Sequence, residues 1–352
     1  MDLSLFGWNL NWAAALSAVQ TELNKAVEPA RVFMANRGVW RVASAEGEFD
    51  ASLSGAMLSA ASDMRPVTGD WIALDSGSPR ISAVLPRRTW LARKQAGRAV
   101  RAQPIAANLD VLFIVMGLDR DFNPRRLERY LLLAAEGGVT PVVVLNKSDL
   151  CEDLARRVSA AAALTHAEIV AISALQPGAA QQLHRYVEPG QSAALVGSSG
   201  TGKSTIVNAL LGEARQTTTE VRDGDGRGRH TTTSRELFEL PQGWLLMDTP
   251  GMRELEVWSE GGLDEAAFAA TFADVAEVAA GCRFRDCRHQ GEPGCAVARA
   301  LEAGRLDPER TSNLARLRGE LTAQERKRRG RAGSRAQNQM YRSGLRDKWT
   351  GM

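Results

Sequence analysis

From about residue 106, the chain alternates between apolar runs and amphipathic stretches. The apolar runs, which have the length of buried strands, are residues 109–116, 141–145, 169–172, 193–196 and 244–247. Between them, residues 125–135, 152–164 and 203–211 have helical spacing. Continuous apolar strands that alternate with helices indicate a parallel sheet covered on both faces. We therefore predict an α/β domain over residues 103–256.

The first part of the chain, residues 1–102, has a different pattern. Short β-type segments at residues 32–34, 38–42, 70–74 and 81–85 are separated by turns that contain Gly, Ser or Pro. Such segments favour a small barrel or a sandwich, and a basic five-stranded barrel would suit an OB-fold. Periodicity alone does not choose between these. Ahead of the strands, the alanine-rich residues 10–27 are predicted to form a helix.

Beyond about residue 257 the strand pattern ceases. Residues 263–279 are predicted to be helical, a cysteine cluster follows, and the tail from Pro308 onward is charged and mostly helical. We expect a third, mostly α-helical domain over residues 257–352. A chain of 352 residues can hold these domains, because single cores stop growing at about 250–300 residues.

The composition excludes several classes of protein. A hydrophobic fraction of 44% and a charged fraction of 24% are typical of soluble globular proteins. No apolar run approaches the roughly 18 residues of a membrane span, and Asp2 argues against a signal peptide. The chain has four cysteines, most of them between residues 282 and 295, which suits a metal site in a reducing cytoplasm. We expect a cytoplasmic protein without a membrane partner, and nothing demands more than a monomer.

A glycine-rich segment carries the strongest chemical signal. It reads Gly197-Ser198-Ser199-Gly200-Thr201-Gly202-Lys203-Ser204-Thr205, after the apolar run 193–196 and at the start of a helical stretch. In this context the glycines allow backbone N–H groups to point at a β-phosphate, and the helix N-terminus adds positive charge. Lys203 should reach the β- and γ-phosphates, and Ser204 should bind Mg²⁺. The sequence therefore predicts a phosphate loop, residues 197–205.

A second motif selects the base. Asn146-Lys147-Ser148-Asp149 follows the run 141–145, and a carboxylate at Asp149 can accept hydrogen bonds from N1–H and the exocyclic amine of guanine. Adenine would leave that carboxylate unpaired, which is how such sites discriminate. Ser173-Ala174-Leu175, after the run 169–172, fits the loop whose backbone N–H meets the base oxygen. This combination excludes an ATP-dependent P-loop kinase.

A third motif, Asp248-Thr249-Pro250-Gly251, follows the run 244–247. Asp248 would hold Mg²⁺ through water, and Gly251 would offer its N–H to the γ-phosphate as the switch that senses hydrolysis. Motifs at the carboxyl ends of several strands form one nucleotide site in an α/β sheet. We therefore predict a GTPase domain (G domain) that binds GTP or GDP with Mg²⁺.

The order of these motifs is circularly permuted, because the guanine motif precedes the phosphate loop. The chain consequently leaves the G domain just after the γ-phosphate switch and continues into the cysteine-rich region. We hypothesise that the switch pulls on that region. Identical hydrogen exchange of residues 257–300 with GDP and with a GTP analogue would contradict this.

Hydrolysis needs a group that orients the attacking water, and the position that is glutamine in Ras-like enzymes is Met252 here. The nearest candidate is His230, in residues 226–233, between the phosphate loop and Asp248; a solvated loop histidine is the alternative. One of Thr231, Thr232 and Thr233 should close on Mg²⁺ and the γ-phosphate. We take Thr232 as the candidate ligand, although the sequence does not choose among the three.

The cysteine cluster has the pattern Cys282-x4-Cys287-x-His289-x5-Cys295. Thiolates with one imidazole match a closed tetrahedral site for one structural Zn²⁺. A redox pair or unrelated buried thiols are the alternatives.

Basic residues concentrate in two strips, although the net charge is only +3. The first strip includes Arg87, Arg88, Arg93 and Lys94, and the second includes Arg326, Lys327, Arg328 and Arg329. Charge runs are usually solvated faces. Two strips that flank a nucleotide-binding domain favour a polyanionic partner.

The order and flanks of these motifs resemble the RsgA (YjeQ/EngC) family of small-ribosomal-subunit-dependent GTPases. The resemblance lies in residues 103–110, 146–149, 197–205, 226–233, 248–251 and 282–297, with weaker likeness at residues 7–12 and 67–71. Thr201 and Gly281 depart from the family pattern without touching a predicted ligand.

The resemblance implies an N-terminal OB-fold barrel, a permuted G domain and a C-terminal zinc domain. It implies low GTPase activity that the 30S subunit stimulates, late in maturation of that subunit, and a catalytic histidine at His230. It gives the basic strips a partner, the phosphates of 16S rRNA. A non-catalytic GTP-gated rRNA-binding module and a permuted GTPase of large-subunit assembly are the alternatives.

Overall fold

The computed structural model describes residues 1–36, 38–59, 64–94, 102–119, 122–212, 236–248, 264–323 and 325–326. The chain divides into two compact units. The first comprises Met1–Arg93 and Gln103–Glu256, and the second comprises Lys94–Ala102 and Val257–Met352. In the described part, no helix is both long and apolar enough to span a bilayer.

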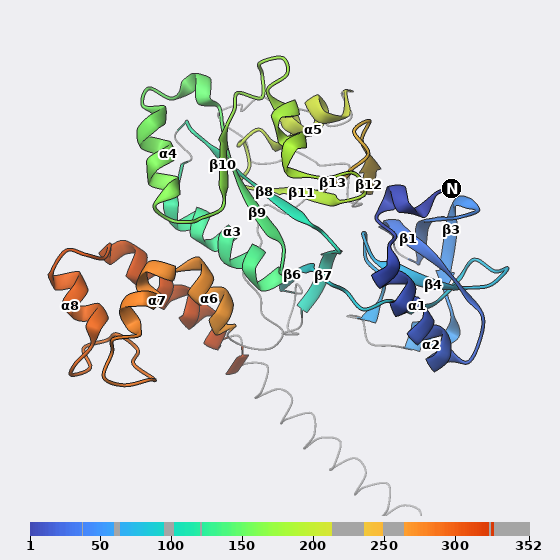
Figure 1. Ribbon diagram of the computed structural model, residues 1–352, viewed down its shortest axis with the longest axis horizontal. Coiled ribbons are helices and arrows are strands. Elements are labelled where there is room, and N and C mark those ends of the chain that lie inside the picture. The colour runs from blue at the N-terminus through green and yellow to red at the C-terminus, as the bar shows by residue number, and fades with distance from the viewer. Residues whose placement is uncertain are drawn as a thin grey trace, which may run out of the picture. The chain divides into compact units, whose positions relative to one another are not determined.

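The N-terminal strands of the first unit close into a five-stranded barrel (Figure 1). Its strands are β1 (Val27–Asn36), β2 (Val39–Ser44), β3 (Gly47–Leu53), β4 (Trp71–Asp75) and β5 (Arg80–Val84). They follow the order β1-β2-β3-β5-β4, and a pairing between β1 and β4 closes the circle. The predicted N-terminal barrel is thereby confirmed. Sequence reasoning missed β3, because only its last few residues are buried and Glu48 and Asp50 face solvent.

Short helices accompany the barrel. They are η1 (Leu3–Phe6), α1 (Leu10–Leu23) and α2 (Gly55–Ser59). The side chain of Asn9 caps α1 by accepting from the backbone N–H of Asn11 and Trp12, and α1 ends at Asn24 in the left-handed conformation. Trp12 is the buried residue of this helix. The predicted helix over residues 10–27 therefore ends earlier than expected, because the chain already extends into β1 at Val27.

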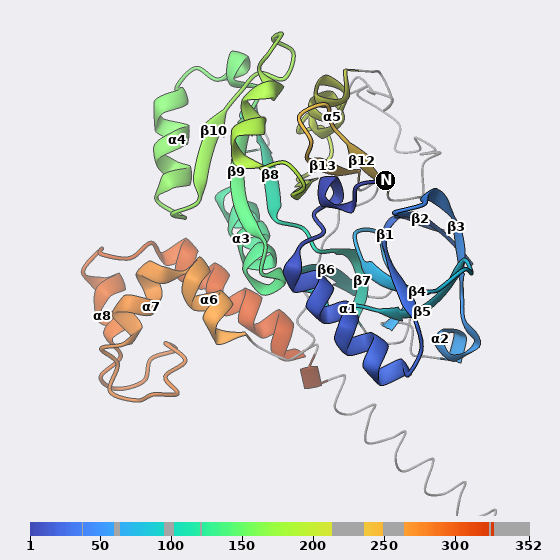
Figure 2. The same cartoon turned by 45° about the vertical axis from the view of Figure 1, so that its right-hand side comes forward.

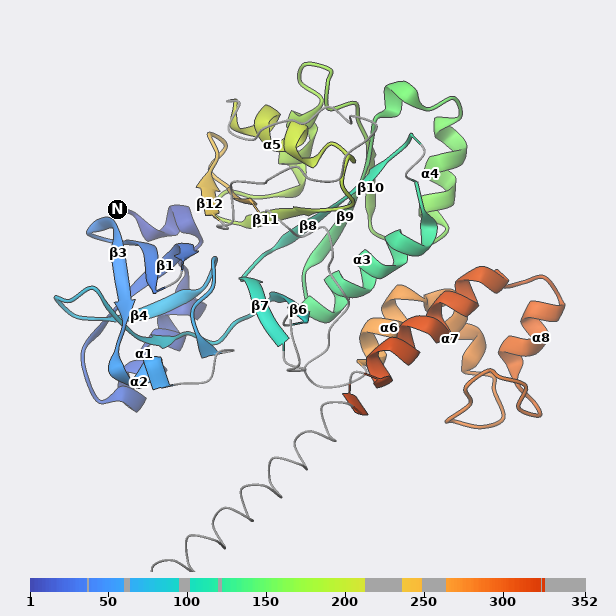
Figure 3. The ribbon, with the colours of Figure 1, turned by 180° about the vertical axis from the view of Figure 1, so that it is seen from behind.

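The G domain is a sheet with helices on both faces (Figures 2 and 3). Its elements are β8 (Val111–Gly117), α3 (Pro124–Gly137), β9 (Thr140–Asn146), η3 (Ser148–Leu150), α4 (Leu154–Ala162), β10 (Glu168–Ala171), η4 (Ala180–Tyr186), β11 (Ser192–Val196), α5 (Lys203–Leu211), β12 (Glu236–Glu239) and β13 (Leu245–Asp248). The strand order is β10-β9-β8-β11-β13-β12, in which the first five strands are parallel and β12 is antiparallel. The predicted α/β class is confirmed.

Alternate residues of β8 lie in two different hydrophobic clusters. Leu112 and Ile114 pack with the cluster that includes residues of α3 and α4, whereas Phe113 and Val115 pack with the cluster of α5 and η4. The strand is therefore buried on both faces, which explains its uninterrupted apolar run.

Strand β12 joins the G-domain sheet to the barrel. It pairs with β13, and Met34 of β1 pairs with Glu236. Nearby, Arg31 is buried at 2% exposure and donates to Ser192 Oγ at 2.6 Å and to the carbonyl of Asn108 at 3.3 Å. Burial lowers the pKa of Arg31 to about 10. A separate two-stranded sheet pairs β6 (Trp90–Lys94) with β7 (Ala102–Ala107).

The second unit contains α6 (Glu265–Thr271), α7 (Ala273–Ala279) and α8 (Ala296–Glu302), and residues 308–323 are also helical. The predicted single helix over residues 263–279 is broken at Phe272, whose φ of −119° and ψ of 48° are not helical. Phe268 and Phe272 are both buried, and Arg310 donates to the Asp274 carboxylate at 2.9 Å. The break separates α6 from α7, and both aromatic rings lie in the core. A mostly α-helical C-terminal region is confirmed.

Candidate functional site

The phosphate loop connects β11 to α5, and its glycines are required by close backbone contacts. At Gly197 φ is 149°, and a Cβ atom would lie 2.2 Å from the carbonyl oxygen of Val115. At Gly202 φ is 93°, and a Cβ atom would lie 2.2 Å from Asn146 Nδ2. Both conformations favour glycine. The loop is thus pressed against β8 on one side and against the guanine motif on the other.

Lys203 lies over the phosphate loop. Its Nζ donates to the carbonyl oxygens of Gly197 at 2.7 Å and Ser198 at 2.5 Å. Thr201 is fully buried and donates from Oγ1 to the same Ser198 carbonyl at 3.0 Å. Ser199 and Gly200 are exposed, and Ser204 and Thr205 lie half-buried in the first turn of α5. The ammonium group is therefore held at the mouth of the loop, where phosphates would bind.

Asn146 links the phosphate loop to both guanine-reading segments. Its side chain is 2% exposed; Nδ2 donates to the carbonyl of Thr201 at 2.8 Å, and Oδ1 accepts from the backbone N–H of Ala174 at 2.9 Å. The backbone N–H of Ser148 donates to the carbonyl of Ile172 at 3.1 Å. The structure thus brings together three predicted motifs that are far apart in the sequence.

Lys147 and Asp149 present their side chains at the edge of this site. Lys147 has a φ of 65° and its Nζ contacts Asp119 Oδ2 at 2.5 Å. Asp149 is exposed, as a base-reading carboxylate needs to be. Ser173 is buried at 3% exposure beneath the accessory loop. Sequence reasoning missed Asp119, because a single aspartate in a loop after a strand belongs to no recognisable motif.

Two leucines beside the guanine motifs are unusually exposed. Leu150 follows Asp149 and is 62% exposed, and Leu175 follows Ala174 and is 81% exposed. Sequence reasoning placed Leu175 in the accessory guanine loop and gave Leu150 no role. A purine ring has apolar faces, so exposed leucines next to the hydrogen-bonding groups suit a base-binding cleft.

The predicted switch residues are described only in part. Asp248 ends β13, which pairs in parallel with β11, so its backbone lies at the sheet edge that also holds the phosphate loop. His230, Gly251, Met252 and the threonines Thr231, Thr232 and Thr233 lie outside the described residues.

The predicted zinc ligands converge in the second unit. The ligand atoms of Cys282, Cys287, His289 and Cys295 all lie within 4.8 Å of one another. His289 Nδ1 is 3.7 Å from Cys282 Sγ and 3.5 Å from Cys295 Sγ. A tetrahedral ion with Zn–S near 2.3 Å and Zn–N near 2.05 Å would separate sulfur and nitrogen by about 3.6 Å. The donor set and its spacing therefore fit one Zn²⁺ ion.

Backbone amides and one carboxylate support this cluster. Cys282 Sγ accepts from the N–H of Ala296, and Cys295 Sγ accepts from the N–H of Ala298, each at 3.3 Å. Glu292 accepts from the N–H of Arg288 at 2.8 Å and of Gln290 at 2.7 Å. These backbone hydrogen bonds lower the pKa of Glu292 to about 2. The carboxylate orders the turn in which His289 adopts a φ of 61°.

Comparison with known proteins identifies relatives of this chain. The family model of the RsgA GTPase matches residues 84–258. The small ribosomal subunit biogenesis GTPase RsgA of Xylella fastidiosa is 53% identical over 261 residues, which are 73% of this chain and 76% of that protein. That of Opitutus terrae is 44% identical over 335 residues, which are 91% and 90% of the two chains.

The chain belongs to the RsgA GTPase family. Solved structures agree: YjeQ from Thermotoga maritima aligns with a TM-score of 0.62 at 25% identity, over 84% of this chain and 99% of that one. YloQ, a circularly permuted GTPase, shares the fold with a TM-score of 0.59 at 21% identity, over 85% and 96% of the two chains. The resemblance drawn from the sequence motifs is confirmed.

In this RsgA-family chain, the residues of the first basic strip differ in their surroundings. Arg87 donates from Nε and Nη2 to the buried carboxylate of Asp70, each at 2.8 Å, and also to the carbonyl of Arg65. Arg88 is exposed and its guanidinium lies 4.8 Å from the centroid of the Trp12 ring. Of these two, Arg88 is the one placed to meet a partner.

The other predicted RNA-contacting residues are described less fully. Arg93 and Lys94 lie at the end of β6, and Arg326 is exposed near the end of the helical residues of the second unit. Lys327, Arg328 and Arg329 lie outside the described residues.

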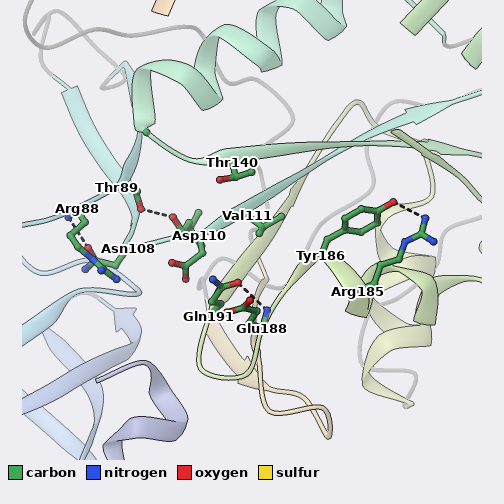
Figure 4. A pocket seen from close by; sticks show the side chains of 12 residues that line it. Arg88, Thr89, Asn108, Asp110, Val111, Thr140, Arg185, Tyr186, Glu188 and Gln191 are labelled. Atoms are coloured by element: carbon green, nitrogen blue, oxygen red, sulfur yellow. Dashed lines mark hydrogen bonds between the residues drawn. The ribbon is translucent and has the colours of Figure 1, made fainter. Parts of the chain in front are cut away.

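A pocket of about 480 Å³ lies where strands β8 and β9 begin, whereas the phosphate loop follows the carboxyl end of β11. Figure 4 shows the residues that line the pocket. Its lining includes Val111 and Thr140, the first residues of β8 and β9, where parallel strands begin. Arg88, Asp110, Arg185 and Glu188 give it mixed charge. Nucleotides bind at the carboxyl ends of strands in such sheets, so this pocket is distinct from the GTP site.

Proposed function

We propose that this chain hydrolyses GTP to GDP and phosphate in the biogenesis of the small ribosomal subunit. The observation that carries the proposal is the pair of hydrogen bonds by which Asn146 ties the phosphate loop to both guanine-reading segments. This arrangement places the segments that would read guanine beside the loop that would bind the phosphates. Its relatives carry the name small ribosomal subunit biogenesis GTPase RsgA, and we extend that role to this chain.

In this proposal the phosphate loop, residues 197–205, binds the phosphates through its backbone N–H groups and Lys203. Asn146, Lys147, Ser148 and Asp149, with Ser173 and Ala174, bind the base. Mg²⁺, when bound, neutralises charge on the phosphates, and Ser204, Asp248 and Thr232 would hold it. His230 orients the attacking water, and the N–H of Gly251 meets the γ-phosphate.

The zinc cluster has a structural role in this proposal. Four protein ligands leave no position for a substrate, so one Zn²⁺ at Cys282, Cys287, His289 and Cys295 would stabilise the second unit without taking part in hydrolysis.

We further propose that the 30S subunit stimulates hydrolysis and that Arg88, Arg93, Lys94 and residues 326–329 contact phosphates of its 16S rRNA. The chain would act as a monomer in the cytoplasm, where ribosomal subunits mature. Charge supports this assignment, because phosphate contacts need exposed cations but no base-specific geometry.

The decisive experiment measures phosphate release from GTP by the purified chain, alone and with purified 30S or 50S subunits. We expect a rate increase with 30S subunits only. GTP-dependent binding to 30S subunits without stimulated hydrolysis would favour the GTP-gated binding module. Stimulation by 50S subunits, or co-sedimentation with them, would favour a role in large-subunit assembly.

A further inference from the structure

An arginine in the first turn of α3 reaches the phosphate loop. Arg126 donates from Nη1 to the side-chain hydroxyl of Ser198, the second residue of the loop. The two residues are 72 positions apart in the sequence, and Arg126 belongs to none of the motifs that define the nucleotide site.

The start of α3 holds the backbone of Arg126 in place. Asn123 is the N-cap, and its side-chain oxygen accepts from the N–H of Arg125 at 2.9 Å and of Arg126 at 3.2 Å. Pro124 occupies the first helical position. A capped first turn with proline is rigid, so the guanidinium is carried on a fixed support.

Arginine at this place is locally unfavourable. The N-terminus of a helix carries partial positive charge and favours acidic residues, yet α3 has Arg125 and Arg126 there and no acidic residue in its first turn. Arg125 pairs with the buried Glu128 at 2.6 Å. For Arg126, the hydrogen bond to Ser198 of the phosphate loop offsets part of the unfavourable interaction with the positive end of the helix. Residues that break a local preference are expected at functional sites.

Ser198 is held on two sides. Its carbonyl oxygen accepts from Lys203 Nζ and Thr201 Oγ1, while its hydroxyl accepts from Arg126. When Lys203 binds the β- and γ-phosphates of GTP, its hydrogen bond to the carbonyl of Ser198 must weaken or break. The contact from Arg126 does not compete with the phosphates, and so it can keep this part of the loop in position.

We propose that Arg126 is a positioning residue for GTP hydrolysis. Acting through Ser198, it fixes the first half of the phosphate loop and places a positive charge behind it. Preorganised charge near a group that gains negative charge lowers the barrier without reorganisation during the reaction. The effect should therefore appear in the rate of hydrolysis more than in the affinity for GDP. This inference rests on the proposed GTPase function.

The test uses the full-length chain and the variants R126M, R126K, S198A and the double variant R126M/S198A. Single-turnover hydrolysis of GTP and the affinity for fluorescent GDP are measured for each. We expect R126M and S198A each to slow hydrolysis roughly tenfold while GDP affinity changes less than about threefold. The double variant should be no slower than R126M, because R126M already removes both the positive charge and the contact to Ser198. R126K, which keeps the charge and a donor, should stay within about threefold of the parent chain.

Arg156 provides a matched control, since it is an exposed arginine of the neighbouring helix α4. R156M should hydrolyse GTP at the parent rate. Additive losses in the double variant would overturn the inference, because Arg126 would then act independently of Ser198. Equal losses of GDP affinity and hydrolysis rate would also overturn it, since they indicate a merely structural contact. If the parent chain itself does not hydrolyse GTP, with or without 30S subunits, the proposed function fails instead.

Discussion

Asn146 shows how much a single buried side chain can organise. Its amide donates to the phosphate loop and accepts from the accessory guanine loop. An unpaired buried polar group costs about 1–3 kcal/mol, so both loops depend on this residue. The sequence indicated Asn146 as part of a base-reading motif, and the structure shows that its side chain also links the phosphate loop to the accessory guanine loop.

Replacing Asn146 with alanine should therefore weaken both GTP and GDP binding. Loss of two buried hydrogen bonds at about 1–1.5 kcal/mol each predicts a fall in affinity of roughly thirtyfold to 150-fold. Titration with fluorescent GDP and GTP measures it. Asn11, an exposed residue of α1, is the control, and N11A should bind normally. An N146A variant with parent affinity would show that the two loops are held by other contacts.

Among elements, the phosphate loop depends on space as well as on charge. A Cβ atom at Gly202 would lie 2.2 Å from Asn146 Nδ2, whereas one at Gly212, the C-cap of α5, would meet nothing within 4 Å. Both glycines have positive φ, at 93° and 69°. Comparison of the two sites separates steric clash from backbone strain.

We expect Gly202→Ala to abolish nucleotide binding, because the loop must move away from Asn146. Gly212→Ala carries only the strain of a left-handed alanine, about 1 kcal/mol, and should lower the melting temperature slightly while nucleotide binding is retained. Isothermal titration and thermal melting distinguish the two. Equal behaviour of the variants in nucleotide binding would contradict the proposed clash.

The turn between His289 and Cys295 is a second element whose geometry depends on one side chain. Glu292 accepts the backbone N–H groups of Arg288 and Gln290, which flank the ligand His289, and thereby orients this ligand. Groups that orient metal ligands typically contribute tenfold to a hundredfold to metal affinity.

Replacing Glu292 with alanine should lower zinc affinity by roughly that factor, while the loaded chain still holds one ion. Competition with a chromogenic chelator measures the affinity, and elemental analysis measures the stoichiometry. Glu302, the last residue of α8, is exposed, and E302A should bind zinc as the parent does. Unchanged affinity in E292A would mean that the turn keeps its shape without the carboxylate.

At the scale of the first unit, a buried ion pair stabilises the end of the barrel. Asp70 is fully buried and Arg87 is 16% exposed; they form a bidentate pair at 2.8 Å. Burial raises the pKa of Asp70, and the hydrogen bond and charge of Arg87 act against that increase. Removing Arg87 alone would leave the carboxylate without its main counterion.

Arg87→Met should therefore destabilise the first unit by about 3 kcal/mol, the usual cost of breaking a buried pair. Chemical denaturation measures this loss. The control is R80M, since Arg80 is exposed at the start of β5. A normal denaturation profile with reduced 30S binding would instead assign Arg87 to rRNA contact.

Arg88→Met should behave differently from Arg87→Met. Its stability should change little, and its binding to 30S subunits should weaken in a salt-dependent manner.

Local patterns were sufficient to predict much of this molecule. Continuous apolar runs predicted the parallel strands, because a strand that is buried on both faces shows no alternation of apolar and polar residues. The motifs at residues 146–149 and 197–205 predicted a guanine-nucleotide site, since each combines a turn geometry with a specific chemical group. Cys282, Cys287, His289 and Cys295 predicted a metal site because their spacing is short enough for a local fold to bring them together.

Local patterns failed where long-range contacts decide the outcome. Strands β3 and β12 carry charged, half-exposed residues, and they are strands because neighbouring strands pair with them. The helix predicted over residues 263–279 breaks at Phe272, a buried residue whose ring stacks on that of Phe268.

The amino-acid sequence alone determined the fold class, the nucleotide and the metal donor set, because these depend on residue type and spacing within short segments. Tertiary structure decided which groups hold the site together. Asn146 reaches Thr201 and Ala174, Arg126 reaches Ser198, and Arg87 pairs with Asp70. These partners are far enough apart in the chain that no local pattern relates them. Only packing of the sheet, its helices and the barrel brings each pair within hydrogen-bonding distance.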